Sequence, residues 1–498
     1  MNNIIKNFKN IKYGPAPEDD KDVLKWIKNL SSPNRIYING KWTLSKSSKT
    51  LQAINPSTNS KLFKLVVSSK KDVDSAVIAA NKAYPKWSKL SSYKRSQYLY
   101  ALARLIQKHA RFLSVLESID NGKPIRETRD IDIPLVARHF YYHAGWAAKS
   151  KDSVKSLGVV GQIIPWNFPL LMLAWKIAPA IACGNTVVLK PAEYTSLTAI
   201  FFAELCMKAK LPNGVINIVT GDGSTGQHIT NHPLVKKIAF TGSTEVGKKI
   251  IASTSNTNKK LTMELGGKSP FIVFEDADLD SAVEGVVDAI WFNQGQVCCA
   301  GSRLLIQESI EKKFIKKLKQ RMEKLRVGNP LDKSIDIGAI VAPVQLKKID
   351  SLVKKGVKEG AKLWQPSWSC PKEGLFYPPS LFTNVTPASY IAQIEIFGPV
   401  LTSLTFRTPS EAVAIANNTP YGLAASIWSE NINLALDVAP KVKAGVIWIN
   451  STNLFDAACG FGGFKESGFG REGGSEGIRA YTKINLPVVR GSKKTNNK

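Results

Sequence analysis

The sequence has few cysteines, few histidines and no long apolar run. Its six cysteines are scattered over 498 residues without the C-x-x-C spacing of a zinc site. The five histidines form no H-E-x-x-H motif. No apolar run reaches the roughly 20 residues that cross a bilayer. These absences exclude a disulfide scaffold, and they predict no structural metal, no membrane partner and a reduced, cytoplasmic compartment.

The chain also has few acidic residues relative to its basic residues. Lysines and arginines number 68 against 39 acidic residues, so the formal net charge is +29 and nucleic-acid binding has to be considered. In the densest basic stretch, residues 310–327, Phe314, Leu318 and Met322 recur at helical spacing, which puts the lysines on a solvated face. Lysines are also spread over the whole chain. We therefore interpret the charge as a compositional bias and predict no specific nucleic-acid partner.

The order of the predicted elements indicates an α/β fold. A single core rarely exceeds about 300 residues, so this length predicts more than one domain. Strands and helices alternate in the middle of the chain, which is typical of a parallel, doubly wound sheet. We expect strands at 159–164, 186–189, 215–219 and 237–241 and helices at 169–182, 196–208 and 247–253. A second alternating region has strands at 271–274, 303–306, 400–406, 424–428 and 445–449.

Three segments carry candidate catalytic residues. Cys298 follows a glycine-containing turn in 292–303 (FNQGQVCCAGSR), where it is a candidate nucleophile. Taken alone, it is more simply a buried structural thiol. The segment MELGGK puts Glu264 at a strand end, and PWNFP puts Asn167 at the mouth of another strand. A thiol, a carboxylate and an amide donor together supply the nucleophile, the base and the oxyanion stabiliser that acyl transfer needs.

Together these segments resemble the aldehyde dehydrogenase superfamily. The resemblance runs from about residue 35 to 481 and includes the separation between Glu264 and Cys298. Further matching segments are KPAE at 190–193, FTGS at 240–243, EIFGP at 395–399 and FGGFK at 461–465. Residues 13–18 and 280–290 are most similar to the family-16 branch of that superfamily.

The resemblance implies a fold and a reaction. The fold has a Rossmann-like NAD(P)-binding domain over 20–265, a catalytic α/β domain over 266–470, and a return to the first domain over 471–492. The implied reaction oxidises an aldehyde to the carboxylic acid. Cys298 attacks the carbonyl, Asn167 and the Cys298 N–H hold the oxyanion, and Glu264 activates the water that releases the acid from a thioester.

The resemblance also implies a cofactor, NAD, with NADP as the alternative. Its pyrophosphate is expected near Ser243, at the N-terminus of a helix opened by Gly242. Lys190 and Glu193 are expected at the adenosine ribose. The other expected contacts are Ile164, Pro165, Trp166, Gly223, Leu265, Glu395 and Phe397, the last two at the nicotinamide end. The G-x-G-x-x-G match at 221–226 follows a strand, but we interpret it as coincidental in detail.

An aromatic tunnel is expected to receive the substrate. Each aromatic residue alone is more simply part of a core, but as a set they predict an apolar path for an aliphatic or aromatic aldehyde. An aromatic box for a quaternary ammonium group is the alternative. The tunnel residues implied by the resemblance are Phe168, Met172, Trp175, Phe292, Phe455 and Phe461.

Two departures from the family pattern concern assembly. Only residues 147–158 separate the helix containing Trp146 from the strand at 159, which is too short for the family's full two-stranded oligomerisation arm. Pro487 lacks an N–H and interrupts the terminal strand at 484–489. Both departures predict a homodimer in preference to a tetramer.

Three alternative functions stay open at this point. The first is a catalytically weak or silent family member with a scaffold role, against which the intact Cys298, Glu264 and Asn167 argue. The second is nucleic-acid binding, suggested by charge alone. The third is a CoA-acylating enzyme, a reaction whose family members generally lack the base that Glu264 supplies.

Overall fold

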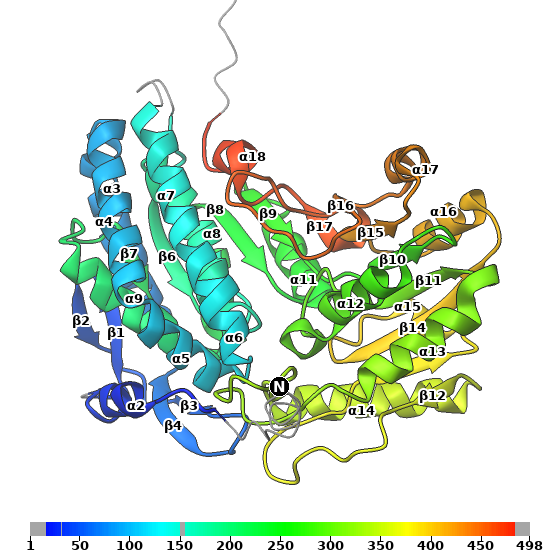
Figure 1. Ribbon diagram of the computed structural model, residues 1–498. Coiled ribbons are helices and arrows are strands. Elements are labelled where there is room, and N and C mark those ends of the chain that lie inside the picture. The colour runs from blue at the N-terminus through cyan, green and yellow to red at the C-terminus, as the bar shows by residue number, and fades with distance from the viewer. Residues whose placement is uncertain (1–15, 31, 150–154, 484–498) are drawn as a thin grey trace, which may run out of the picture.

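The computed structural model describes residues 16–30, 32–149 and 155–483. An eight-stranded sheet with the order β17-β9-β8-β5-β6-β7-β1-β2 forms the core of one half of the molecule (Figure 1). Its strands are β1 (Arg35–Ile38), β2 (Lys41–Leu44), β5 (Val159–Ile163), β6 (Thr186–Lys190), β7 (Ile216–Ile218), β8 (Val235–Thr241), β9 (Lys260–Glu264) and β17 (Gly468–Phe469). The central strands β5, β6, β7, β8 and β9 pair in parallel, whereas β1, β2 and β17 are antiparallel to their neighbours.

Helices accompany this sheet along the chain. They are α2 (Lys21–Lys28), α3 (Lys70–Lys89), α4 (Ser92–Lys108), α5 (Ala110–Asn121), α6 (Ile125–Glu127), α7 (Ile133–Lys149), α8 (Pro169–Ala182), α9 (Leu197–Lys208), α10 (Gly223–Asn231), α11 (Thr244–Thr254) and α18 (Gly474–Ala480), with a π-turn η1 (Thr128–Asp132). Helix α8 is buried along its whole length, because its apolar residues leave no polar face. A small two-stranded sheet, β3 (Thr50–Ile54) and β4 (Lys61–Val66), lies outside the main sheet.

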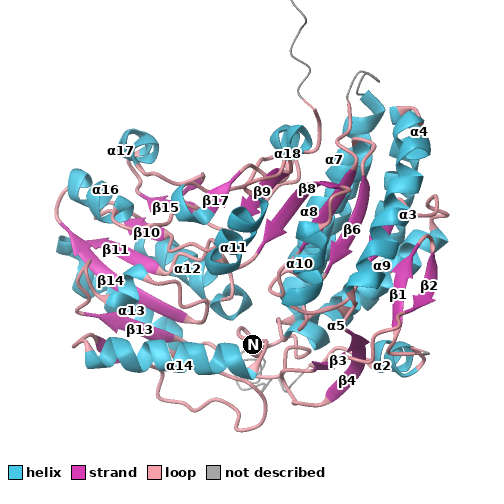
Figure 2. Cartoon of the chain, turned by 180° about the vertical axis from the view of Figure 1, so that it is seen from behind, coloured by secondary structure: helices cyan, strands magenta, loops and turns pink. Residues whose placement is uncertain are grey.

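A seven-stranded sheet with the order β12-β13-β14-β11-β10-β15-β16 forms the other half, and Figure 2 shows both halves from behind. Its strands are β10 (Pro270–Val273), β11 (Arg303–Gln307), β12 (Lys362–Trp364), β13 (Ser380–Thr383), β14 (Val400–Phe406), β15 (Ala424–Trp428) and β16 (Val446–Ile449). The remaining helices and short turns are α12 (Leu279–Ile290), η2 (Phe292–Gly295), η3 (Glu308–Ile310), α13 (Glu311–Met322), α14 (Pro343–Lys358), α15 (Tyr390–Gln393), α16 (Pro409–Asn417), α17 (Ile432–Val438), η4 (Ala439–Lys441) and η5 (Lys465–Ser467).

The predicted alternation of strands and helices is confirmed. The helix expected at 169–182 spans those same residues as α8, and every expected strand is present within a few residues of its predicted bounds. The helix expected at 247–253 begins earlier, at Thr244, because the Ser243 side chain accepts a hydrogen bond from the Val246 N–H and caps it. The sequence analysis did not predict the short strands β1, β2, β12 and β13, which lie at or next to the edges of the two sheets.

The chain crosses between the two sheets twice. It leaves the first sheet after β9 and enters the second at β10, and it returns to the first sheet at β17. The loop that follows Glu264 therefore joins the two halves. Helix α7 ends at Lys149, and an isolated bridge pairs Ser156 with Thr482 close to the other end of the described chain. Residues 150–154 and the strand predicted at 484–489, with Pro487, lie outside the described residues.

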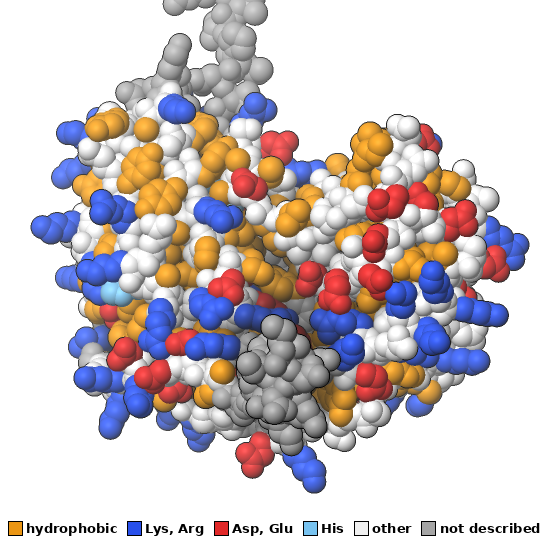
Figure 3. Space-filling model, viewed as in Figure 1, with side chains coloured by type: hydrophobic (Ala, Val, Ile, Leu, Met, Phe, Trp, Pro, Cys, Tyr) orange, Lys and Arg blue, Asp and Glu red, His pale blue; other side chains and the backbone are white. Residues whose placement is uncertain are grey.

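Charge is distributed over the surface. Figure 3 shows lysine and arginine side chains over both halves, interspersed with acidic groups and not gathered into one patch on that face. The predicted basic helix forms as α13, with Phe314, Leu318 and Met322 buried and the lysines on the outer side. Within the described ranges, no helix is both long and apolar enough to span a membrane.

Candidate active site

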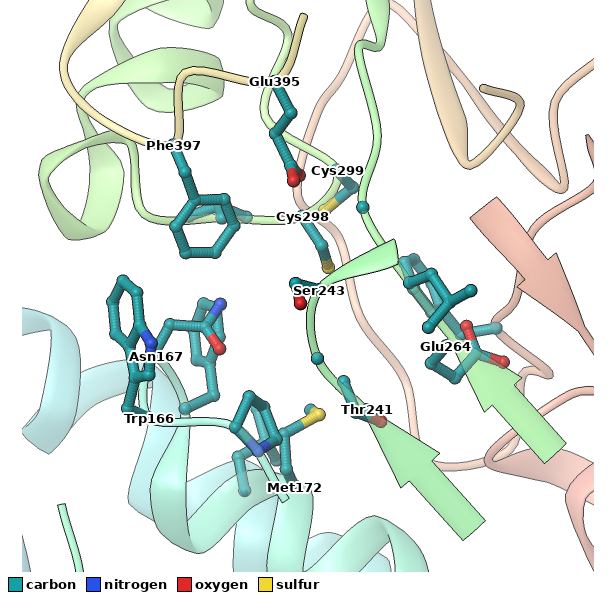
Figure 4. A pocket seen from close by; sticks show the side chains of 18 of the residues that line it. Trp166, Asn167, Met172, Thr241, Ser243, Glu264, Cys298, Cys299, Glu395 and Phe397 are labelled. Carbon is teal, nitrogen blue, oxygen red and sulfur yellow. The ribbon is translucent and has the colours of Figure 1, made fainter. Parts of the chain in front are cut away.

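A cavity of about 1020 Å³ contains the three residues predicted to carry the chemistry. Cys298, Glu264 and Asn167 all line it, although they come from three different segments of the chain (Figure 4). Asn167 lies between β5 and α8, Glu264 is the last residue of β9, and Cys298 follows the turn η2. The cavity thus lies at the carboxyl ends of parallel strands, which is where α/β sheets place their ligands.

The Cys298 thiol is half-buried and faces this cavity. Its hydrogen bond with the Cys299 side chain, followed by burial, holds the pKa of the Cys298 thiol well above its usual value. Cys299 is itself buried, and its Sγ lies 3.7 Å from Asn453 Oδ1. A thiol with a raised pKa is mostly protonated, so Cys298 needs a base in order to act as a nucleophile.

Glu264 is the buried carboxylate of this cavity. Its side chain reaches in from β9, on the side opposite Trp166 and Phe397 in Figure 4. Burial holds the pKa of Glu264 well above its usual value; the nearby charge of Glu472 raises this pKa further, whereas Lys176 lowers it. Neither carboxylate oxygen has a hydrogen-bond partner among the described residues. A raised pKa makes this carboxylate a stronger base than an exposed glutamate.

Two glycines after Glu264 allow the backbone there to pack closely against Cys298 and Glu395. A Cβ on Gly267 would lie 2.4 Å from the Cys298 carbonyl oxygen, and a Cβ on Gly266 would lie 2.4 Å from Glu395 Oε2. At Gly267 the close atom belongs to the backbone, so only glycine permits this approach, whereas a Cβ at Gly266 would displace the Glu395 carboxylate. The Gly267 N–H donates a hydrogen bond to Glu395 Oε1 at 2.9 Å. Burial raises the pKa of Glu395 to about 7.

Most of the predicted cofactor residues border the same cavity. Those that do are Pro165, Trp166, Gly242, Ser243, Leu265, Glu395 and Phe397. Trp166 and Phe397 meet edge to face, with ring centroids 5.2 Å apart. Ser243 caps α11, so the free N–H groups of that helix begin at the cavity wall. Thr241 also lines the cavity, and its buried hydroxyl has no hydrogen-bond partner in the described part of the chain.

The other four predicted cofactor residues, Ile164, Lys190, Glu193 and Gly223, lie outside this cavity. Lys190 Nζ donates to the Gly221 carbonyl at 2.9 Å and lies 3.7 Å from Glu193 Oε2. The Ile164 N–H donates to the Lys190 carbonyl at 3.2 Å. Gly223 opens α10, and a Cβ added there would meet nothing within 4 Å. These residues gather beyond the ends of β5, β6 and β7.

Aromatic side chains form the other end of the cavity. Five of the six predicted tunnel residues line it, namely Phe168, Met172, Trp175, Phe455 and Phe461. Phe292 differs from the prediction, because it lies behind Phe168 with its ring stacked at a centroid distance of 6.1 Å. It borders a separate pocket with Trp291 and Glu127. Phe292 therefore supports the wall of the tunnel from outside.

Several lining residues were missed in the sequence analysis. Leu171 could have been found, since Phe168, Leu171, Met172 and Trp175 follow one face of a helix. Gln345 and Lys348 come from α14, far along the chain, and no sequence pattern pointed to them. Gln345 Nε2 donates to the Phe397 carbonyl at 2.8 Å and so fixes the loop that carries this ring.

Comparison with known proteins agrees with this geometry. The model of the aldehyde dehydrogenase family matches residues 42–486. The chain belongs to the aldehyde dehydrogenase family. It is similar to aldehyde dehydrogenase family 2 member B4, mitochondrial, of Arabidopsis thaliana, with 44% identity over 475 residues that cover 92% of this chain and 88% of the relative.

Two other proteins show the same likeness. Human retinal dehydrogenase 2 is 43% identical over 474 residues, which cover 92% of each chain. The NAD⁺ complex of an aldehyde dehydrogenase from Bacillus cereus has a TM-score of 0.90 and 39% identity, and the match covers 95% of this chain and 98% of that one. The predicted aldehyde dehydrogenase fold is therefore confirmed.

Proposed function

We propose that this aldehyde dehydrogenase oxidises an aldehyde to the carboxylic acid with NAD as the hydride acceptor, through a thioester on Cys298. The observation that carries the proposal is that Cys298, Glu264 and Asn167 line one cavity. A scaffold role would not require a thiol, a buried carboxylate and an amide donor to converge. The relatives with the same fold are named as dehydrogenases, and one of the solved structures is an NAD⁺ complex.

Each of the three residues has one task in the proposed reaction. Glu264 takes the proton of the Cys298 thiol or of the attacking water, because its raised pKa makes it a stronger base than an exposed carboxylate. The sulfur attacks the aldehyde carbon, and the carbonyl oxygen becomes an oxyanion held by the Asn167 amide and the Cys298 N–H. After the hydride leaves, water cleaves the S–C bond of the thioester, which gives the acid and restores the thiol.

The residues around the cavity fit a dinucleotide. Bound NAD would supply the acceptor for the hydride. We propose that the N-terminus of α11, at Ser243, holds the pyrophosphate and that Glu395, oriented by Gly267, holds the nicotinamide ribose. The carboxylate of Glu193 would hold the adenosine ribose and repel a 2′-phosphate, so NAD is favoured over NADP.

The substrate is proposed to be an uncharged aliphatic or aromatic aldehyde. The tunnel end of the cavity is apolar and aromatic, with Trp175 in contact with both Phe455 and Phe461. The charged lining residues are Glu264, Glu395 and Lys348. A quaternary ammonium aldehyde is the second candidate, because clustered aromatic faces attract such cations. A panel of aldehydes separates the two by their kcat/KM values.

Assembly, location and branch remain proposals. We propose a homodimer, because the segment between α7 and β5 is short. Light scattering of the purified protein tests this, and a stable tetramer would overturn it. We also propose a cytoplasmic location, because the few scattered cysteines are typical of a reducing compartment. The narrower resemblance to the family-16 branch stays a prediction, and the relatives described above carry other names.

The deciding experiment measures NADH and NADPH formation with a panel of aldehydes. We expect turnover with at least one apolar aldehyde, a preference for NAD, and an acid product formed without CoA. Absence of any reduced cofactor would favour the scaffold role. Turnover that requires CoA would favour the acylating alternative.

A further inference from the structure

The turn that precedes Cys298 has an unusual backbone. Asn293, Gln294 and Gly295 all adopt left-handed conformations, with φ values of 47°, 56° and 71°. Gly295 is required here, because a Cβ would lie 2.1 Å from the Gly398 carbonyl oxygen. The other two residues are not glycine, and side chains disfavour this region, so other contacts have to hold them in place.

Asn293 is held on both sides. Its backbone N–H donates to Glu127 Oε2 at 2.9 Å, and both side chains are buried. Its side-chain amide donates to the backbone carbonyl of Asn167 at 2.8 Å and to the backbone carbonyl of Gln296 at 3.3 Å. Asn293 therefore links the loop that carries Asn167 to the loop that carries Cys298.

A separate hydrogen bond to the same Gln296 carbonyl orients the Asn167 side chain. Asn167 Nδ2 donates to the Gln296 carbonyl at 2.8 Å, so one of its two N–H groups is fixed there. The other N–H remains for the cavity that Asn167 shares with Cys298, where both side chains appear in Figure 4. The Gln296 carbonyl, two residues before Cys298, thus receives the amides of both Asn293 and Asn167.

We propose that Asn293 is a positioning residue for the reaction, which fixes the distance and direction between the Asn167 amide and the Cys298 sulfur. The proposal rests on the proposed function, in which Asn167 holds the oxyanion. Asn293 touches neither substrate nor thiol and acts through Asn167 and Gln296. A donor that stabilises an oxyanion has to be aimed in advance, so loss of Asn293 should slow the formation of the thioester.

Gln294 is the matched control. It lies in the same turn, has the same left-handed backbone and is fully buried. Its amide donates to the Ala339 carbonyl at 2.9 Å and to the Gly122 carbonyl at 3.4 Å. These bonds anchor the turn without touching Asn167. Glycine accepts positive φ at either position, so Asn293→Gly and Gln294→Gly each remove one side chain without new backbone strain.

The test compares the single-turnover rate of NADH formation from propanal, with enzyme in excess, in the variants Asn293→Gly, Gln294→Gly and Asn167→Ala. Asn293→Gly is expected to slow this rate at least about tenfold, whereas Gln294→Gly changes it less than about threefold; loss of a whole oxyanion donor costs about 10²–10³-fold. Circular dichroism and NAD affinity establish that each variant is folded.

A double-mutant cycle separates positioning from a general structural role. If Asn293 acts through Asn167, the double variant Asn167→Ala/Asn293→Gly should be no slower than Asn167→Ala alone, because coupled residues are not additive. Asn167→Ala/Gln294→Gly should instead show the product of its two single effects. Multiplying effects of Asn293→Gly and Asn167→Ala would overturn the proposal, as would equal losses in the two glycine variants.

A second variant serves if Asn293→Gly does not fold. Asn293→Asp keeps the shape and tolerates positive φ, but a carboxyl group has at most one O–H and cannot donate to both carbonyls. It should be slow at neutral pH, and wild-type speed there would overturn the proposal. If Asn167→Ala itself leaves the rate unchanged, the proposed role of Asn167 fails first. A slow Asn167→Ala with a normal Asn293→Gly contradicts only the positioning role.

Discussion

Lys176 Nζ lies 2.8 Å from Glu472 Oε1, and both side chains of this ion pair are buried. Both charges act on Glu264, the proposed base at the end of β9: Glu472 raises the pKa of Glu264 and Lys176 lowers it, after the larger effect of burial. The two charges therefore act on the pKa of Glu264 in opposite directions from positions outside the cavity lining.

The first prediction concerns removal of each of these two charges in turn. Lys176→Met should raise the pKa of Glu264 and move the acidic limb of the kcat profile to higher pH. Glu472→Gln should lower this pKa and move the limb the other way, each by about one unit. Steady-state rates from pH 5 to pH 9 measure both shifts. Displacement of the limb in the same direction in both variants would contradict the assignment of this limb to Glu264.

The second prediction distinguishes two adjacent thiols. Cys298→Ala should abolish turnover, because it removes the sulfur that attacks the aldehyde in the proposed mechanism. Cys299→Ala should keep most of the activity, since this thiol is buried and rests near Asn453. The measurement is the steady-state rate with NAD and an active aldehyde. Similar losses in the two variants would leave the nucleophile unassigned.

The third prediction concerns hydrolysis of the thioester. Glu264→Gln keeps the size of the side chain but cannot take a proton, so deacylation should slow by about 10²–10⁴-fold. NADH should appear in a burst near one equivalent per site, followed by a slow steady state. Mass spectrometry should find the acyl group on Cys298. An unchanged steady-state rate would show that Glu264 is not the base, and loss of the burst in a folded variant would make Glu264 the base that deprotonates Cys298.

The fourth prediction concerns stability. Burial raises the pKa of Glu117 to about 8, of Glu127 to about 8 and of Asp120 to about 7. A group whose folded pKa exceeds its unfolded value stabilises the fold at low pH and loses this contribution as the pH rises through the folded pKa. The melting temperature should therefore fall between about pH 5 and pH 8. A melting temperature that rises steadily over this window would contradict these directions.

A variant at Lys123 provides a second test of this prediction. Its ammonium group pairs with Asp132 in the interior and lies 3.7 Å from the centroid of the Phe168 ring. Lys123→Met removes the positive charge beside the buried carboxyl groups of Glu117, Glu127 and Asp132, here called the acidic cluster. This change should lower the free energy of unfolding by about 3–5 kcal/mol. The loss should be larger at high pH, where more of the carboxyl groups are ionised. A pH-independent loss would mean that the cluster does not titrate in the folded protein.

Local patterns predicted most of the fold. The mainly apolar segment 169–182 was predicted as a helix and forms α8. The residue types of the three catalytic candidates were also local information, because a Gly-Gly turn after Glu264 and a glycine turn before Cys298 are visible in the chain. Edge strands such as β12 were missed, since three residues carry little periodicity.

The amino-acid sequence by itself determined the order of strands and helices and the membership of the aldehyde dehydrogenase family, and it pointed to Cys298, Glu264 and Asn167 as the catalytic candidates. Only the tertiary structure decided which distant groups act on them. The bond from Asn293 to Glu127 joins residues 166 positions apart, and Gln345 of α14 donates to the carbonyl of Phe397. Such contacts depend on how buried faces pack, and the side-chain periodicity of a segment specifies which face is buried but not which partner covers it.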